Sequence, residues 1–198
     1  MNKLDEAILF ATKAHEGQVR KLSHAPYIIH PLETMIIVSE FTLAEDVLCA
    51  AVLHDVIEDT SVTIEEVEER FGKRVAELVY AETENKRKGI PPSETWRIRK
   101  EETIAHLKET EDLAVKMLWL GDKLSNMRSV LLEYLNKGDA IWQSFNQTDK
   151  KEHEWYYVEI YKALKKDFGK TKAFMEYETI LSVVFKLRPE KDWEDKTV

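Results

Sequence analysis

The apolar residues of the chain recur three and four positions apart along almost its whole length, which is the spacing of one face of an α-helix. In the first such stretch Ile8, Ala11 and His15 fall on one side, and Gly17 then interrupts the pattern. No segment shows the alternation of apolar and polar residues that is typical of a half-buried strand. The pattern therefore predicts an all-α protein, a compact bundle of about eight to ten helices.

Local signals mark several helix ends. Thr63 and Glu66 form a capping box, and Gly72 follows the short helix that this box opens. Two polar segments, 17–31 and 85–93, are predicted to be loops; the second is basic and contains Pro91-Pro92, and it is either an exposed connector or a loop that closes over a ligand. The expected helices cover residues 4–15, 31–41, 43–57, 63–71, 74–84, 93–110, 112–131, 151–166 and 172–185.

The segment 50–60 carries four ionisable residues on a helix that is apolar on every side, a pattern that predicts burial. Residues four apart are neighbours on a helix, so Glu58 lies next to His54, and Asp59 lies next to Asp55. Buried unpaired charges are costly, and a bound cation would offset that cost. The alternative is that neighbouring side chains satisfy the His–Asp pair while the two acids reach water. The segment alone does not decide between them.

A second polar site interrupts another apolar helix, where Asp122 and Asn126 share a face. His30, in turn, is flanked by Ile29 and Pro31, an unusual setting for a solvated side chain. Two imidazoles and two carboxylates from these three regions would suit a borderline cation such as Mn, Fe or Zn. Such an ion lowers the pKa of a bound water, and Glu58 and Asp59 would then be placed to orient or deprotonate that water.

Composition narrows the class of protein. The chain has 198 residues, enough for one domain, which we expect at 1–185 with a charged tail at 186–198. A net charge of -8 argues against a basic surface that coats nucleic acid. Cys49 is the single cysteine, which excludes a disulfide framework and fits the cytoplasm. Neither a signal peptide nor an apolar run of membrane-spanning length is apparent, so no membrane association is expected.

Three motifs together resemble the HD-domain metal-dependent phosphohydrolases, and within them the small alarmone hydrolases related to the hydrolase half of RelA/SpoT proteins. The motifs are PYIIHP at 26–31, HDVIEDT at 54–60 and GDKLSNMR at 121–128, and the resemblance covers roughly residues 3–165. It implies an HD-domain bundle that hydrolyses the 3′-pyrophosphate of ppGpp or pppGpp to GDP or GTP and pyrophosphate. The substrate would be a small nucleotide, and the sequence leaves open whether the chain forms a homo-oligomer.

The resemblance also implies a role for individual residues. Four of them would bind one Mn²⁺ ion, with Fe, Zn or Co as other divalent candidates, and two would act on the attacking water. The implied metal ligands are His30, His54, Asp55 and Asp122, and the implied catalytic pair is Glu58 and Asp59. The implied substrate-binding residues are Arg20, Lys21, Tyr27, Lys86, Lys123, Asn126 and Tyr156.

The chain departs from the best-known alarmone hydrolases in two segments, the loop at 85–93 and the longer stretch at 136–153. Substrate identity depends on such loops, and the second segment resembles stand-alone bacterial HD proteins of less certain substrate. The chain is also too short to carry the synthetase domain of the bifunctional proteins. Two alternatives therefore remain: hydrolysis of another nucleotide, and a metal-binding nucleotide sensor without turnover. Glu58 and Asp59 favour an enzyme, because a sensor does not need a water-activating pair.

Overall fold

The computed structural model describes residues 2–87 and 89–187, and within these ranges the chain is helical and contains no sheet. One isolated β-bridge joins Val19 and Pro26. The prediction of an all-α bundle is therefore confirmed. In chain order the elements are α1 (Lys3–Ala14), α2 (Ile29–Ser39), α3 (Glu45–Leu53), α4 (Val56–Asp59), α5 (Ile64–Phe71), α6 (Lys73–Glu82), α7 (Pro92–Glu109), α8 (Leu113–Lys137), the 3₁₀ helix η1 (Gly138–Ser144), α9 (Lys150–Phe168) and α10 (Lys172–Phe185).

Side-chain caps begin several of these helices where the sequence predicts them. The hydroxyl of Thr63 accepts a hydrogen bond from the backbone N–H of Glu66 at the start of α5. The carboxylate of Asp112 accepts one from Ala114 at the start of α8. Gly72 has a φ of 91°, which an L-residue rarely adopts, and it separates α5 from α6. Each cap satisfies a backbone donor that would otherwise lack a partner, which fixes where the helix begins.

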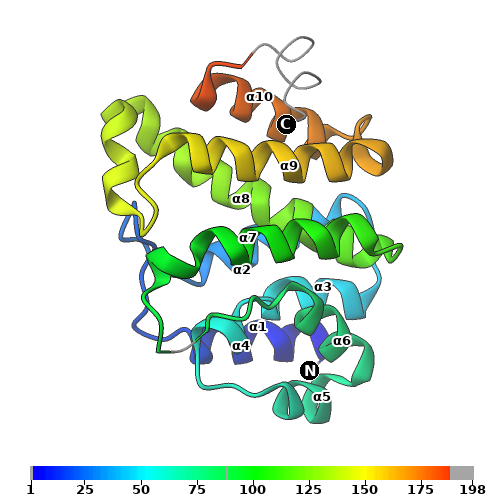
Figure 1. Ribbon diagram of the computed structural model, residues 1–198. Helices are drawn as coiled ribbons and strands as arrows, with labels where there is room; N and C mark the ends of the chain where they lie inside the picture. Colours follow the sequence, from blue (N-terminus) through cyan, green and yellow to red (C-terminus); the bar gives the residue numbers. More distant parts are fainter. Residues whose placement is uncertain (1, 88, 188–198) are drawn as a thin grey trace.

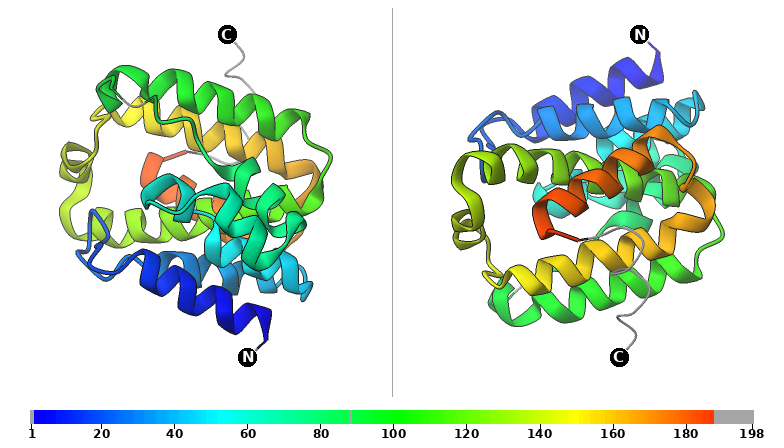
Figure 2. Two further views of the ribbon diagram at one scale, coloured as in Figure 1. Left: turned by 90° about the horizontal axis from the view of Figure 1, so that it is seen from below. Right: turned by 90° about the horizontal axis from the view of Figure 1, so that it is seen from above.

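Helix α8 is the central element of the bundle. It packs against α2, α3, α6, α9, α10 and η1, and Figures 1 and 2 show the other helices arranged around it. Its inward side chains Leu118, Leu120 and Leu124 have no exposed surface. Burying a side chain of this size stabilises the fold by about 1.5–3 kcal/mol. The apolar half of α8 thus forms a rigid support for the polar residues that follow Leu120.

Gly121 lets α8 approach α2 closely. A Cβ atom built on Gly121 would lie 2.8 Å from the Val38 side chain and 3.1 Å from the Thr34 carbonyl oxygen. We expect Gly121→Ala to lower the free energy of unfolding by about 1–3 kcal/mol, because the two helices must move apart. Urea unfolding measures the change, with Asn136→Ala on the exposed end of α8 as the control. Equal stability of the two variants would show that the close approach is not needed.

The sequence predicts one continuous helix over 43–57, and this prediction is wrong at His54 and Asp55, where the helix is interrupted. Helix α3 ends at Leu53 and α4 begins at Val56, with His54 and Asp55 in the turn between them. In a continuous helix, successive side chains point about 100° apart. The turn instead brings His54 Nε2 to 3.1 Å from Asp55 Oδ2. The break therefore aims two adjacent side chains at one point.

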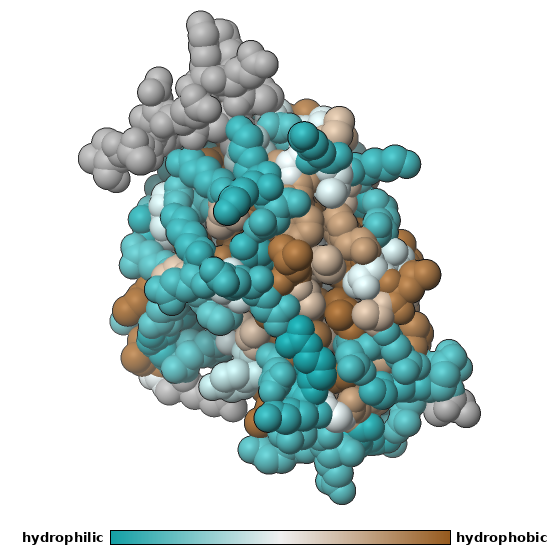
Figure 3. Space-filling model, turned by 90° about the vertical axis from the view of Figure 1, so that its right-hand side faces the viewer, coloured by the Kyte–Doolittle hydropathy of each residue, from teal (hydrophilic) through white to brown (hydrophobic). Residues whose placement is uncertain are grey.

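On the face drawn in Figure 3, apolar side chains form a band bordered by hydrophilic ones. None of the described helices is long and apolar enough to cross a membrane. From residue 188 on, the charged tail predicted at 186–198 lies outside the described residues, and a single domain at 1–185 stays a prediction.

Candidate metal centre

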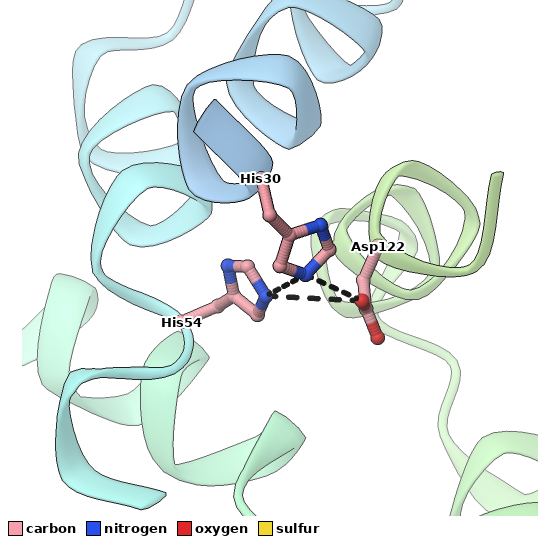
Figure 4. A group of neighbouring side chains, drawn as sticks. All are labelled: His30, His54 and Asp122. Carbon is pink, nitrogen blue, oxygen red and sulfur yellow. Dashed lines mark hydrogen bonds and ion pairs between the residues drawn. The ribbon is translucent and has the colours of Figure 1, made fainter. Parts of the chain in front are cut away.

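The side chains of His30, His54, Asp55 and Asp122 meet at one point in the interior. His30 comes from α2, His54 from the turn before α4 and Asp122 from α8, as Figure 4 shows. Asp55 follows His54 in the same turn. His30 Nε2 lies 3.3 Å from His54 Nε2 and 3.1 Å from Asp122 Oδ1. Asp55 Oδ2 lies 3.4 Å from His30 Nε2. The ligand atoms of His30, His54 and Asp122 lie within 4.8 Å of one another, and Asp55 Oδ2 contacts both imidazoles from one side. That these four residues bind one ion stays a prediction.

Outer hydrogen bonds hold both imidazole rings in one orientation. His54 Nδ1 lies 2.8 Å from the Ala51 carbonyl oxygen, which can only accept, so Nδ1 carries a proton. His30 Nδ1 lies 2.8 Å from the Ser125 hydroxyl, which in turn donates to Glu33 at 2.6 Å. With each Nδ1 bonded in this way, Nε2 faces the centre, where it offers a lone pair to a cation whenever the ring is neutral. Metal-binding histidines are held by outer hydrogen bonds of this kind.

The electrostatics of the centre favour a positive charge. Burial acts to lower the pKa of His54, but Asp55 outweighs it and raises that pKa to about 10. Burial acts to raise the pKa of Asp122. The charge of Lys123 and the hydrogen bond to His30 outweigh burial, and they hold that pKa below its usual range. Without a cation, a protonated imidazole thus balances the carboxylates. The donor atoms, their spacing and this charge demand all fit a divalent cation.

Glu58 and Asp59, the predicted catalytic pair, lie beside this centre on α4. Burial, then Asp55 and Glu84, raise the pKa of Glu58 to about 7. Glu58 accepts a hydrogen bond from the backbone N–H of Glu84 at 3.1 Å. The Tyr27 hydroxyl lies 2.6 Å from Asp55 Oδ2 and 2.8 Å from Asp59 Oδ2, so it bridges the centre and the pair.

Three lysines surround the acidic groups. Lys86 forms ion pairs with Glu58 and Asp59, and the largely buried Lys123 forms one with Asp122. Lys100, on α7, donates to Glu84 at 2.6 Å. The metal cavity, defined here as the space of about 180 Å³ around the centre, is lined by Tyr27, His30, Asp55, Glu58, Asp59, Glu82, Glu84, Lys100, Trp119, Asp122, Lys123 and Asn126.

The predicted residues Arg20 and Lys21 line an adjacent pocket of about 190 Å³, called the basic pocket below. Arg20 donates to Asn126 Oδ1 at 2.8 Å, and Lys21 Nζ lies 5.8 Å from the centre of the Phe145 ring. Tyr27 and Asn126 line both spaces, so the basic pocket and the metal cavity share a wall. The remaining members of the basic pocket are Val19, Leu22, Ser23, Ser129, Val130, Phe145 and Tyr157.

Tyr156 stands apart from the other predicted site residues. It is 3% exposed, and it does not appear among the described residues that line the metal cavity or the basic pocket. Lys100 Nζ lies 4.7 Å from the centre of its ring. Its neighbour Tyr157 lines the basic pocket instead. A contact between Tyr156 and a nucleoside therefore stays a prediction.

The sequence reasoning missed several residues that the fold brings to the centre. Ser125, three residues after Asp122, could have been found from its position on the same helix face. Glu33, three residues after His30, and Trp119, three residues before Asp122, have the same spacing and could have been found in the same way. Glu82, Glu84 and Lys100 gave no comparable signal. Each of these three lies on a segment whose approach to the centre depends on tertiary packing.

Comparison with known proteins places the chain among proteins of one family. The sequence pattern of the HD domain matches residues 7–147. The bifunctional (p)ppGpp synthase/hydrolase SpoT of Escherichia coli K12 is 38% identical over 137 residues, which are 66% of this chain and 18% of that protein. The guanosine-3′,5′-bis(diphosphate) 3′-pyrophosphohydrolase of Aquifex aeolicus is 37% identical over 128 residues, 65% of this chain and 18% of that protein. The chain thus spans less than a fifth of the length of these relatives.

Solved structures of similar length share the fold. A metazoan ortholog of SpoT, reported to hydrolyse ppGpp, matches with a TM-score of 0.72 and 26% identity, over 94% of this chain and 98% of that one. The crystal structure of lmo0812 from Listeria monocytogenes matches with a TM-score of 0.69 and 31% identity, over 82% of this chain and 97% of that one. The bundle described above is therefore found in chains of the same size.

Proposed function

The chain belongs to the HD-domain family, and from this premise we propose that it is a metal-dependent phosphohydrolase that removes the 3′-pyrophosphate of ppGpp or pppGpp. The products would be GDP or GTP and pyrophosphate. The observation that carries the proposal is the convergence of four potential metal ligands beside Glu58 and Asp59. The SpoT ortholog that covers most of this chain supports the choice of substrate.

We assign His30, His54, Asp55 and Asp122 as ligands of one Mn²⁺ ion. Two imidazoles and two carboxylates suit a borderline divalent cation, whereas a site of oxygen ligands alone would suit Mg²⁺ or Ca²⁺. The outer bonds to Ala51 and Ser125, which orient the two imidazoles, support this assignment. Fe²⁺, Zn²⁺ and Co²⁺ are alternative occupants of the same donor set.

A divalent cation at this site would lower the pKa of a water molecule and polarise a phosphoryl oxygen. Glu58 has a pKa near 7 in the metal-free protein, so its carboxylate can take a proton from the attacking water. Asp59 and Tyr27 would orient that water, because the Tyr27 hydroxyl connects Asp59 to Asp55. The protein side chains would thus contribute two things to catalysis: Glu58 takes a proton from the attacking water, and Asp59 and Tyr27 orient that water.

The two neighbouring spaces match the parts of a nucleotide that carries phosphates. Lys123 lines the metal cavity, and Lys86 forms ion pairs with Glu58 and Asp59 of the cavity wall; both can pair with phosphate oxygens. The basic pocket has the planar rings of Phe145 and Tyr157 for a base and the cations Arg20 and Lys21 for further phosphates. Because the two spaces share a wall, one nucleotide can occupy both.

Turnover of a nucleotide panel with added Mn²⁺ tests the proposal. We expect pyrophosphate release from ppGpp and pppGpp, and no release from the same protein treated with a chelator. Hydrolysis of other nucleotides alone would instead indicate a phosphohydrolase of different specificity. Tight binding of ppGpp without turnover would indicate a sensor. Either result would overturn the proposed reaction.

A further inference from the structure

Glu82, the last residue of α6, is a buried carboxyl group that forms no hydrogen bond with any residue that the structure describes. Its side chain is 5% exposed, and neither carboxylate oxygen has a hydrogen-bond partner among the described residues. It lines the metal cavity together with His30, Asp55 and Asp122. The resemblance to known hydrolases assigns it no role. Its position in the wall of the cavity calls for an explanation.

Local structure does not provide one. A buried carboxyl that forms no hydrogen bond loses the hydration it had in the unfolded chain and gains nothing in return. Glu82 also sits at the C-terminus of α6, where the helix dipole disfavours negative charge. Burial raises the pKa of Glu82 to about 8, with the charge of Asp122 acting in the same direction and that of His54 against it. In the metal-free protein this side chain therefore destabilises the fold.

A second orphaned group lies in the same wall. The indole N–H of Trp119, on α8, is buried and has no acceptor among the described residues. Trp119 and Glu82 both line the metal cavity, and both also line the larger space of about 500 Å³ between α6 and α7. A donor and an acceptor that both lack partners in one polar wall are typical of a site for an ordered water molecule.

We propose that Glu82 is an outer ligand of the divalent cation: its carboxylate accepts a hydrogen bond from a water molecule that bridges it to the ion. The inference rests on the metal site of the proposed function. A bridging water is needed because Glu82 is not in the group His30, His54 and Asp122, whose ligand atoms lie within 4.8 Å of one another. Asp55 is also outside that group, but its Oδ2 lies 3.1 Å from His54 Nε2 and 3.4 Å from His30 Nε2, whereas Glu82 forms no such contact among the described residues. The cation then supplies the positive charge that makes an ionised Glu82 favourable, and Trp119 can donate to the same water.

The test is the affinity of the metal-free protein for Mn²⁺ alone, measured by titration calorimetry. We expect Glu82→Gln to weaken binding by about 10–100-fold, the usual effect of losing an outer partner of a metal site. Glu77→Gln is the matched control, because it removes the same charge from the same helix at an exposed position. We expect the control to bind Mn²⁺ as the wild type does.

A second variant separates metal binding from folding. Glu82→Met replaces the carboxyl with an apolar side chain of similar length, so we expect a higher melting temperature than wild type without metal, but a smaller rise on adding Mn²⁺. This opposite pair of changes would not follow from a purely structural role. Wild-type affinity in Glu82→Met, or in a folded Glu82→Gln, would overturn the inference and leave the proposed function intact. Failure of the wild type to bind Mn²⁺ would overturn both.

Discussion

We expect His54→Ala and Asp122→Ala to abolish the retention of divalent metal. Each substitution removes one of four potential ligands, and among the described residues only His30, His54 and Asp122 place their ligand atoms all within 4.8 Å of one another. The loss should exceed the roughly 10–100-fold effect of removing an outer hydrogen-bond partner, because a direct ligand is removed. Elemental analysis after loading with Mn²⁺ and gel filtration measures the metal content, and hydrolysis should fall with it.

The controls are substitutions of the same residue types at exposed positions. Asp139→Ala and His106→Ala change side chains that lie outside the metal cavity, and both should retain the metal content of the wild type. Asp122→Asn is the milder companion of Asp122→Ala, because it keeps a partner for the buried Lys123. Circular dichroism shows that each variant is folded. A full metal complement in both ligand variants would refute the ligand assignment.

The candidate centre could be predicted from the sequence because its residues belong to short motifs. His54 and Asp55 are adjacent to each other, and Glu58 and Asp59 follow within one turn. In such a segment local geometry alone limits where the side chains can lie. Helix ends were predictable for the same reason, since Thr63 and Asp112 cap their helices through contacts within three residues.

The turn at His54 and Asp55 could not be predicted in this way. Every residue from Val47 to Leu53 is buried, so the apolar pattern continues through the break without a glycine or proline to mark it. The break is favoured by tertiary contacts: Tyr27 binds Asp55 from the loop before α2. A periodic pattern reports which residues are buried, and it does not report a turn between two buried segments.

Hydrogen-bond partners that come from distant segments of the chain could not be predicted from the sequence either. The Glu84 carboxylate accepts hydrogen bonds from Arg99, Lys100 and Thr103 on α7, while its backbone N–H holds Glu58. Charged residues are common along the predicted helix 93–110, and nothing in their spacing distinguishes Lys100 from its exposed neighbours. Only the packing of α7 across the centre gives Lys100 its place in the metal cavity.

Glu58→Gln is expected to keep the metal and to lose most of the catalytic rate. The amide has nearly the same shape, and Lys86 keeps Asp59 as its ion-pair partner, so the fold and the ligands should be undisturbed. Removing a general base typically costs about 10²–10⁴-fold in rate. Steady-state turnover at saturating Mn²⁺ measures the loss, and Glu69→Gln at an exposed position on α5 is the control. Unchanged turnover would remove Glu58 from the mechanism.

The pH dependence of the hydrolysis rate shows whether Glu58→Gln is slow because it lacks a general base or because a metal ligand has moved. Burial, followed by the charges of Asp55 and Glu84, raises the pKa of Glu58 to about 7 in the metal-free protein. A general base works only when deprotonated, so the wild-type rate should rise with pH as Glu58 loses its proton. A nearby cation lowers that pKa, which places the rise below pH 7. Glu58→Gln has no proton to lose at this position, so its residual rate should lack this rise. If the variant kept the wild-type profile at a lower rate, another group would be the base and Glu58 would act only by position.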